Sequence, residues 1–419
     1  MPMEQNLKKN MLWNAAGNLI YMACQWLITV IVANAESFHD AGVLSIAMSV
    51  SATFQTLAMF GIRNYQVSDV EEKYSNSAYV GFRVLTCGAA MIGCIGFSLI
   101  TGYLGEQLLA IFLFMLFRLA ENFSDVLHGI AQKNQRLDLA GKSFAIKGVG
   151  LLSLFLVSYR MSGSLNLGLA AMAVFSCAST ALFDALVIKR VAAFSFWENG
   201  RSCLALARET APLCAYLFLS AAMTTVPKLF LGETMGEEIL GAYSSIFAPA
   251  LLIQAAMGYI YTPFAQVLGK HREEHDYRRF FSLSLKLTGA IAVLTVVMLI
   301  AAYFLGEWAL TLIFGIDILP YVSYLIPILF AISATSFFAF LCMLATVLRN
   351  FFWLLLSCGA GLLTEVAVTV SWIHARGANA ASYSLILGMS LSSLILMLGL
   401  GIRMFFVRNK TVKEDKTYE

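Results

Sequence analysis

Four ionisable side chains stand close together at the end of a long apolar run, in the stretch LFRLAENFSDVLHG, Leu116–Gly129. At about 100° per residue, a helix places Arg118, Glu121, Asn122 and Asp125 on one arc, and apolar side chains fill the opposite face. Guanidinium groups bind anions, and carboxylates inside membranes take part in proton relays. The spacing therefore indicates a shared polar environment within apolar surroundings.

Two interpretations of this arc are open. Each charge at bilayer depth costs about 2.5–3.5 kcal/mol on insertion scales. Arg118 can pair with Glu121 or Asp125 and so join neighbouring helices. Alternatively, the arc lines a water-filled cavity and includes a carboxylate that titrates.

A second stripe, without charge, lies nearer the amino terminus. Asn14, Asn18, Tyr21 and Gln25 fall within about 60° of one another on a helix. Such a stripe can donate hydrogen bonds to sugar hydroxyls. It can equally join two helices, because polar side chains often bond across helices in membranes.

Three further residues are candidates for chemistry. Arg63 ends an apolar run, and its planar fork suits phosphate as well as it suits anchoring at the cytoplasmic surface. Lys228 lies near the outer end of its run, where an excess of basic residues is not expected. Glu365 lies deep in its run with no basic neighbour in sequence, which makes it the best candidate for a proton site.

Other ionisable groups have simpler explanations. Arg83 and Lys147 lie near inner ends of apolar runs, from where long basic side chains snorkel to the surface. Asp184 is about one turn from Lys189, so a surface ion pair is expected there. HREEH, residues 271–275, matches an inverted zinc-protease pattern, but its charged loop argues against metal catalysis.

The composition determines which elements must position these residues. The chain is 59% hydrophobic and 13% charged, with a mean hydropathy of +0.76. A soluble domain is about 45–50% apolar and about 25% charged. The apolar runs are long and do not alternate, so helices and not barrel strands are expected. We expect an all-α polytopic membrane protein with about twelve transmembrane helices. The expected spans are 11–33, 38–62, 78–102, 107–129, 141–159, 165–188, 211–231, 240–268, 280–305, 319–347, 351–373 and 378–406.

Basic residues predict the orientation of these helices. With the amino terminus inside, about 21 of the 28 Lys and Arg residues fall in cytoplasmic connections. The carboxyl terminus is then also inside. The outer connections carry acidic residues instead, namely Glu36, Asp40, Glu106, Glu233, Glu237, Glu238, Glu307 and Asp317.

A polar interruption near the middle divides the chain into two halves of six spans. We expect an N-terminal lobe over 1–190, a cytoplasmic amphipathic linker over 191–208 and a C-terminal lobe over 209–419. All connections are short, so no soluble catalytic domain is inserted. Gly-rich phosphate loops of the Walker type are absent from the sequence, so ATP is not expected to drive this protein directly.

Several stretches resemble one known family. They are LWNAAGNLIYMACQWLITVIVAN, AGVLSIAMSVSATFQTLAMFGIRNYQVSD and RLAENFSDVLHGIAQKNQRLDLAGKS, with GAYSSIFAPALLIQAAMGYIYTPFAQVL and LTLIFGIDILPYVSYLIPILFAISA in the second half. They are similar to polysaccharide exporters, the Wzx-like flippases of the multidrug/oligosaccharidyl-lipid/polysaccharide (MOP) superfamily. Many members have fourteen spans, whereas this sequence indicates about twelve.

The resemblance implies two six-helix bundles around a cavity that opens alternately to each side, as in a MATE/MOP-like fold. Its usual cargo is an undecaprenyl-diphosphate-linked oligosaccharide in the cytoplasmic membrane of a bacterium. Family members place basic residues in the cavity for the pyrophosphate, and Arg63 and Arg118 lie where such residues are expected. From the residues themselves, Lys228 is a further candidate for the phosphates, and Asn14, Asn18, Tyr21, Gln25 and Asn122 are candidates for sugar contacts. Glu121, Asp125 and Glu365 are the acids available for coupling; neither a cofactor nor a metal is expected, and a proton or sodium gradient supplies the energy.

Three functions are compared on this basis. A lipid-linked oligosaccharide flippase explains basic groups that accompany the acids, and its partners are a polysaccharide polymerase and glycosyltransferases. A multidrug antiporter of the same superfamily favours an acidic or apolar pocket for cations. A membrane-embedded polymerase or ligase needs a large outer loop with catalytic groups, and the outer loops here are short, so an enzyme is not expected.

Overall fold

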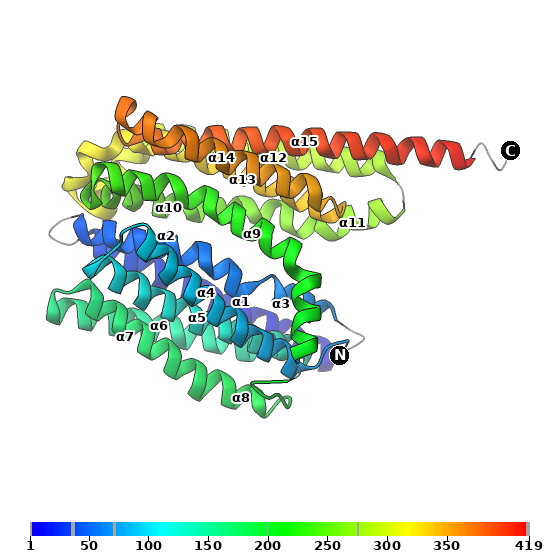
Figure 1. Cartoon of the computed structure of the whole chain (residues 1–419), viewed down its shortest axis with the longest axis horizontal. Helices are drawn as coiled ribbons and strands as arrows, with labels where there is room; N and C mark the ends of the chain where they lie inside the picture. The colour runs from blue at the N-terminus through cyan, green and yellow to red at the C-terminus, as the bar shows by residue number, and fades with distance from the viewer. Residues whose placement is uncertain (1, 35–37, 70–72, 199, 275, 416–419) are drawn as a thin grey trace. The chain divides into compact units, whose positions relative to one another are not determined.

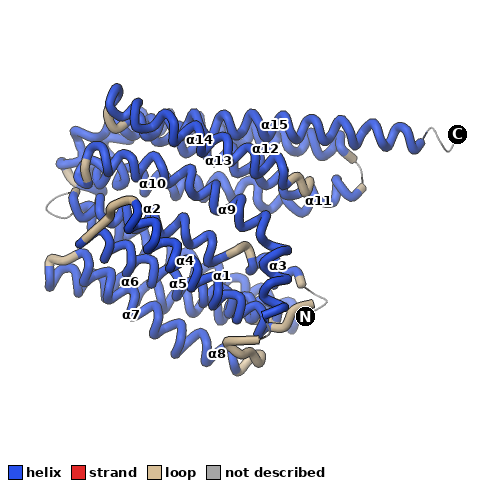
Figure 2. The backbone as a smooth tube through the Cα atoms, viewed as in Figure 1, coloured by secondary structure: helices blue, strands red, loops and turns tan. Residues whose placement is uncertain are grey.

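The structure is a computed structural model that describes residues 2–34, 38–69, 73–198, 200–274 and 276–415. Every regular element in these residues is a helix, and none is a strand (Figure 2). The expected all-α membrane fold is therefore confirmed. The elements are α1 (Pro2–Ala33), α2 (His39–Met59), α3 (Ile62–Ser68), α4 (Asn76–Ile100), α5 (Gly105–Lys133), α6 (Leu137–Ser162), α7 (Leu165–Ser179), the π-helix η1 (Thr180–Ala185), α8 (Leu186–Lys189), α9 (Gly200–Met235), α10 (Glu237–Tyr261), the 3₁₀ helix η2 (Thr262–Phe264), α11 (Ala265–Glu273), α12 (Tyr277–Phe314), the 3₁₀ helix η3 (Ile316–Tyr324), α13 (Leu325–Val347), α14 (Phe351–Arg376) and α15 (Asn379–Asp415).

Eleven helical segments of the described chain are long and apolar enough to cross a membrane. They correspond to eleven of the twelve expected spans. The other expected span, 107–129, falls in α5, which has 29 residues and carries the ionisable stretch. At about 1.5 Å per residue this helix is about 44 Å long, which is sufficient to cross the hydrocarbon.

The chain divides into two compact units, Met1–Ala221 and Ala222–Glu419. In the first unit, α5 is the central helix and packs against α2, α4, α6 and α7 (Figure 1). In the second unit, α15 packs against α13 and α14, and α13 also contacts α10 and α12. Helix α9 begins in the first unit and ends in the second.

The segment expected as a linker is part of the first unit. Phe194, Cys203 and Leu206 are buried in an apolar cluster with side chains from α3, α4, α5 and α8. The backbone N–H of Ser195 also donates a hydrogen bond to the Ser77 hydroxyl of α4 at 2.9 Å. Aromatic and apolar side chains of the expected linker, 191–208, thus pack against the first unit, which extends to Ala221.

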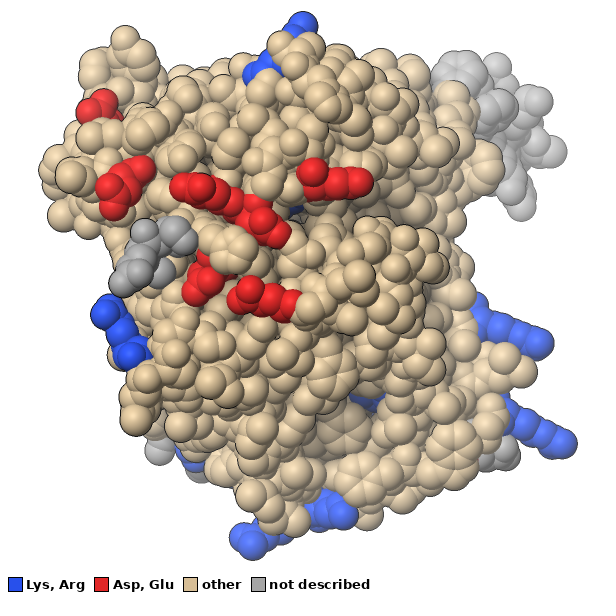
Figure 3. Space-filling view, turned by 60° about the vertical axis from the view of Figure 1, so that its left-hand side comes forward, with Lys and Arg blue, Asp and Glu red and all other residues tan. Residues whose placement is uncertain are grey.

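Acidic side chains occupy the outer connections of each unit. Figure 3 looks toward these loops and shows Asp and Glu side chains gathered on the visible surface, with Lys and Arg at its margins. In the first unit, Asp40 accepts a hydrogen bond from the Tyr159 hydroxyl at 2.7 Å, and His39 lies 3.9 Å from Glu106. Of the acids expected here, Glu36 lies outside the described residues.

Glycines set the approach of α1 to α6. A Cβ atom added at Gly17 would overlap the Gly141 carbonyl oxygen, and one added at Gly148 would lie 2.9 Å from the Tyr21 Cα. Helix pairs in membranes associate through such small residues, because lipid gives no hydrophobic drive to their contact. Backbone contact therefore holds α1 in place along α6.

We predict that Gly17→Ala lowers the melting temperature of the purified protein in detergent, because the added methyl group forces α1 away from α6. Gly88→Ala, in α4, is the matched control, since nothing lies within 4 Å of its added Cβ. That change should leave the melting temperature unchanged or raise it, because Ala favours a helix over Gly by about 1 kcal/mol. Equal melting temperatures for the two variants would show that the close contact does not matter.

Candidate functional site

Asp125 of α5 binds two arginines in the first unit. One carboxylate oxygen lies 2.5 Å from Arg63 Nη1, and the other lies 3.3 Å from Arg83 Nη2. Arg63 also donates to the Gln132 side chain at 3.0 Å. The Arg83 side chain is fully buried, whereas those of Arg63 and Asp125 are 24% and 22% exposed. Asp125 thus fixes one buried and one partly accessible guanidinium group.

The local backbone explains why these groups meet. Phe60 and Gly61 both have positive φ, 49° and 68°, and they turn the chain between α2 and α3. The turn leaves carbonyls at the end of α2 without helical partners. Arg83 donates to the Ala58 carbonyl at 2.6 Å, and the Thr86 hydroxyl donates to the same oxygen at 2.8 Å. Arg83 therefore caps α2, which corrects the expectation that it snorkels to the surface.

Arg118 forms a separate pair on the same helix. Its Nη1 lies 2.9 Å from Glu121 Oε2, and its guanidinium carbon lies 5.1 and 5.2 Å from the ring centres of Phe114 and Phe117. Cations over aromatic faces are attracted by the ring quadrupole. The side chains of Arg118 and Glu121 are 23% and 15% exposed. The residues of the predicted arc thus belong to two separate groups of ion pairs. Arg118 pairs with Glu121, and Asp125 pairs with Arg63 and Arg83.

Asn122 connects α5 to α2. Its side-chain oxygen accepts a hydrogen bond from Gln55 at 3.1 Å, while its amide nitrogen is buried with no partner in the described part of the chain. Only 2% of Asn122 is exposed. In this conformation the residue therefore joins helices and has a donor left over.

The stripe on α1 runs beside α6. The Tyr21 ring lies 5.6 Å from the Phe144 ring, and the Tyr21 hydroxyl is buried without a hydrogen-bond partner among the described residues. Gln25 likewise has a buried amide nitrogen without a described partner. Asn14 and Asn18 are half-buried. Tyr21 thus contacts α6 through its ring, while its hydroxyl makes no hydrogen bond across helices in the described residues, so both interpretations of the stripe stay open.

The first unit also holds a buried polar network that the sequence did not suggest. Lys147 Nζ donates to Asp184 Oδ2 at 2.6 Å, to the Thr180 hydroxyl at 3.0 Å and to the Ser124 hydroxyl. His128 Nε2 lies 3.5 Å from the other Asp184 oxygen. All five residues are at most 5% exposed. The three ammonium hydrogens of Lys147 thus have three acceptors, which compensates for burial of the charge.

This network corrects two expectations. Lys147 does not snorkel, and Asp184 pairs with Lys147 rather than with Lys189. The cause is the π-helix Thr180–Ala185, which carries both Thr180 and Asp184. Sequence periodicity assumes about 100° per residue and therefore misplaces side chains that follow a π-helical turn.

A cluster between the loop after α3 and the first half of α9 holds α9 to the first unit. Glu209 accepts hydrogen bonds from Lys73 at 2.6 Å, from the Tyr74 hydroxyl at 3.1 Å and from the Tyr65 hydroxyl. The hydrogen bond to Glu209 raises the pKa of Lys73 above its ordinary value. Glu209 ties α9 to the loop after α3.

Two candidates lie in the second unit. Lys228 Nζ stands 3.7 Å from the centre of the Phe247 ring. Glu365 is fully buried, and neither of its carboxylate oxygens has a hydrogen-bond partner among the described residues. It packs against Gly388 of α15, where an added Cβ would overlap the carboxylate. A buried carboxylate in this state needs a proton, a cation or a donor.

Two sets of His and acidic side chains resemble metal-binding patterns. His39, Asp40 and Glu106 at the outer surface place their ligand atoms within 4.8 Å of one another. Exposed acids gather in this way without a metal, and Asp40 already accepts the Tyr159 hydrogen bond. In the HREEH stretch, His271 lies 3.9 Å from Glu274, and His275 lies outside the described residues. Neither group forms a buried metal centre.

Comparison with known proteins gives consistent results. A sequence model of the family described as polysaccharide biosynthesis protein matches residues 7–268. The capsular polysaccharide biosynthesis protein CapF of Staphylococcus aureus is 26% identical over 312 residues, which are 73% of this chain and 77% of that protein.

Solved structures show the same fold. An inward-facing multidrug resistance MATE transporter of the MOP superfamily superposes with a TM-score of 0.75 at 12% identity, over 96% of this chain and 99% of that chain. The lipid II flippase MurJ in an inward closed conformation gives 0.71 at 12% identity, over 94% and 89%. The MATE transporter VcmN of Vibrio cholerae gives 0.64 at 11% identity, over 96% of each chain.

We predict that Lys147→Met or Asp184→Asn alone destabilises the protein by about 3–5 kcal/mol, because each leaves a buried charge without its partner. The double variant Lys147→Met/Asp184→Leu should recover most of that loss. Unfolding of the purified protein by increasing SDS in mixed micelles measures the effect.

The control is the exposed ion pair of Lys142 with Asp138 in the first turns of α6, in which Lys142 is 44% exposed. Lys142→Met should cost at most about 1 kcal/mol. Single variants of Lys147 and Asp184 with costs as small as this control would contradict a buried, tightly coupled network.

Proposed function

The chain belongs to the polysaccharide biosynthesis protein family, and from this premise we propose that it flips lipid-linked oligosaccharide across a bacterial cytoplasmic membrane. The cargo proposed is an undecaprenyl-diphosphate-linked repeat unit for a surface polysaccharide. Movement follows alternating access between two helical bundles. One observation supports this proposal most directly. Arg63 of α3 is partly exposed, and Asp125 and Gln132 of α5 hold its guanidinium group in place.

The arginines paired with Asp125 and Glu121 suit an anionic cargo, with Arg63 and Arg118 partly exposed and Arg83 fully buried. Arg63, Arg83 and Arg118 supply three guanidinium groups, and Asp125 and Glu121 supply two carboxylates. One positive charge is therefore in excess. A guanidinium group offers two parallel donors to a phosphate, which makes it better suited than an ammonium to a diphosphate.

A diphosphate-sugar head group cannot cross hydrocarbon without such groups. An unpaired charge in an apolar medium costs many kcal/mol, and each unbonded hydroxyl adds to the cost. We assign Arg63, Arg118 and Lys228 to the phosphates. Asn122 and the stripe of Asn14, Asn18, Tyr21 and Gln25 supply neutral hydrogen-bonding groups for the sugars, and the free Asn122 amide donor supports this role.

Glu365 is the acid best placed to couple transport to an ion gradient. Asp125 is occupied by two arginines and Glu121 by Arg118, whereas Glu365 has no described hydrogen-bond partner. Binding and release of a proton or sodium ion at Glu365 would change the charge between α14 and α15. No bond in the cargo is made or broken in this scheme, so the protein acts as a transporter, with glycosyltransferases before it and a polymerase after it.

We predict that Arg63→Gln and Arg118→Gln each lower flipping by about 10- to 100-fold, because a charge-assisted hydrogen bond contributes about 1.5–3 kcal/mol. Surface glycan in a strain that lacks the native gene, and protection of labelled lipid-linked oligosaccharide in proteoliposomes, measure this loss. Arg136→Gln is the control, because Arg136 is 48% exposed at the cytoplasmic surface. Normal glycan with both variants would overturn the assignment, and transport of cationic drugs without glycan transport would point to an antiporter.

We predict that Glu365→Gln makes flipping insensitive to an imposed gradient. The amide keeps the shape of the side chain but neither releases a proton nor carries a charge for sodium. Proteoliposomes with a proton gradient, a sodium gradient or neither distinguish the two ions. Glu106→Gln is the control, since Glu106 is exposed at the outer surface. A wild-type response to both gradients in the Glu365 variant would remove this residue from coupling.

A further inference from the structure

Arg63 stands on α3, a helix of only seven residues, Ile62–Ser68. Isolated helices shorter than about 12 residues are barely stable, because few hydrogen bonds repay the cost of the first turn. The chain also turns sharply just before α3, where Gly61 has a φ of 68°. Contacts with neighbouring helices therefore decide where α3 lies, and with it the backbone of Arg63.

On one side, α3 is bound to α5. The Arg63 guanidinium group donates hydrogen bonds to Asp125 and to Gln132. The amide of Gln66, which is fully buried, donates to the Val126 carbonyl at 3.3 Å. These contacts hold the tip of Arg63 and one face of α3. Contacts on one face alone leave a short helix free to rotate about them.

On the other side, α3 is bound to α9. Tyr65 follows Arg63 by two residues, about 200° around a helix, so the two side chains leave α3 in nearly opposite directions. The Tyr65 hydroxyl donates to Glu209 of α9. A Cβ added at Gly61 would lie 2.6 Å from the Leu213 side chain, four residues further along α9. The first half of α9 therefore runs along α3 in the opposite direction (Figure 1).

The carboxylate of Glu209 is fixed by two further donors. Lys73 donates to it at 2.6 Å, and the Tyr74 hydroxyl donates at 3.1 Å. The backbone N–H groups of Lys73 and Tyr74 donate in turn to Asp69, the residue after α3, at 2.9 and 3.1 Å. Glu209 thus holds both Tyr65 and the residues that follow α3.

We propose that Glu209 is a positioning residue for Arg63. This role rests on the proposed function, in which Arg63 binds phosphate. Glu209 holds α3 through Tyr65, and α3 holds the Arg63 backbone where the guanidinium group reaches Asp125 and still stays 24% exposed. Without Glu209, α3 rotates about its contacts with α5. A planar guanidinium fork binds phosphate through two parallel donors, so a rotated fork loses one of them.

The alternative is that Glu209 only stabilises α9 on the first unit. Both roles lower the melting temperature when Glu209 is replaced, so stability does not distinguish them. Residues that act through one another give non-additive effects, whereas independent residues give additive ones. Positioning therefore makes the effect of Glu209 on phosphate binding depend on the presence of Arg63.

The test is a double-mutant cycle on binding of inorganic pyrophosphate to the full-length protein in nanodiscs, measured by isothermal titration calorimetry. We expect Glu209→Ala to weaken binding about three- to tenfold, because partly exposed charge-assisted hydrogen bonds contribute modestly. In an Arg63→Gln background, Glu209→Ala should have no further effect. Equal weakening in the two backgrounds would overturn the proposal, as would an unchanged affinity in Glu209→Ala where Arg63→Gln lowers it.

Chemical labelling is the second arm and needs no ligand. Phenylglyoxal reacts with guanidinium groups, and mass spectrometry gives the rate at each arginine. We expect Glu209→Ala, and the milder Tyr65→Phe, to raise the rate at Arg63 about threefold or more, because a released helix opens more often. The rate at Arg118 should stay the same, since its partner Glu121 lies on the same helix. Equal rates at Arg63 in the wild type and both variants would refute positioning.

Glu198→Ala is the matched control. Glu198 precedes α9 and accepts a hydrogen bond from the Ser75 hydroxyl at the start of α4, so it makes a similar contact that does not involve α3. Its loss should change neither pyrophosphate affinity nor labelling at Arg63. An effect as large as that of Glu209→Ala would show that any loosening of this segment disturbs Arg63, which contradicts a specific role for Glu209.

These measurements separate the role of Glu209 from the proposed function, because they use no oligosaccharide and measure no flipping. Faster labelling at Arg63 in Glu209→Ala, with pyrophosphate binding unchanged in Arg63→Gln, would keep the positioning and remove phosphate binding by Arg63. Binding that depends on Arg63, with neither assay affected by Glu209→Ala, would do the reverse.

Discussion

Hydrocarbon offers no hydrogen-bond partner, and this constraint governs every charged group inside the protein. The ammonium group of Lys147 can be buried between helices because Asp184, Thr180 and Ser124 accept hydrogen bonds from it. Arg83 is acceptable because it bonds the end of α2 and Asp125. These two buried ion pairs therefore also fix the relative positions of the helices that they join, so the polar groups of the first unit form part of its framework.

The same constraint makes exceptions informative. Glu365 is buried in the second unit without a described partner, and Asn122 has an unused donor in the first. A buried polar group without a partner costs free energy, so a ligand or proton that satisfies it binds there with a gain. The satisfied groups build the scaffold on which Arg63 and Arg118 stand partly exposed, and in the proposed function the unsatisfied groups are where a proton, an ion or a sugar binds.

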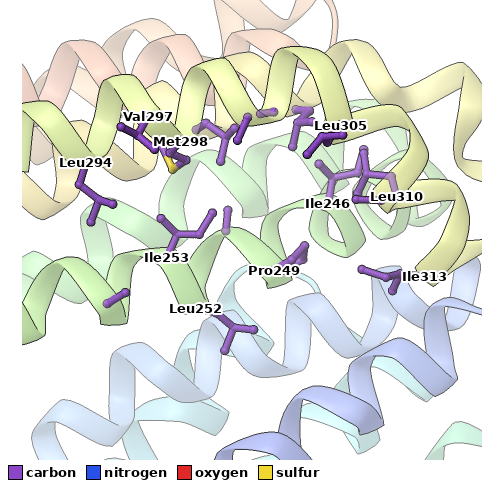
Figure 4. Close-up of a pocket in the computed structure, with 18 residues that line it drawn as sticks. Ile246, Pro249, Leu252, Ile253, Leu294, Val297, Met298, Leu305, Leu310 and Ile313 are labelled. Carbon is purple, nitrogen blue, oxygen red and sulfur yellow. The ribbon is translucent and has the colours of Figure 1, made fainter.

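Small residues serve two opposite purposes in the two units. At Gly17 and Gly141 they allow backbones to touch, so that α1 and α6 pack without a gap. At Ala302 and Ala309 of α12 they line an apolar pocket, which Pro249 of α10 also lines (Figure 4). Small residues thus give a sealed contact in one place and the wall of a pocket in the other, depending on what the opposite helix presents.

The sequence by itself determined the properties that follow from composition and from one helix at a time. Apolar length predicted the spans, Lys and Arg predicted the orientation, and periodicity placed Arg118, Glu121 and Asp125 on one arc. The sequence could not determine which charged side chains form ion pairs with one another, because this pairing depends on which helices lie side by side. Only the tertiary structure assigned Asp125 to Arg63 and Arg83, and Lys147 to Asp184 through a π-helix whose extra residue per turn leaves no mark in the periodicity.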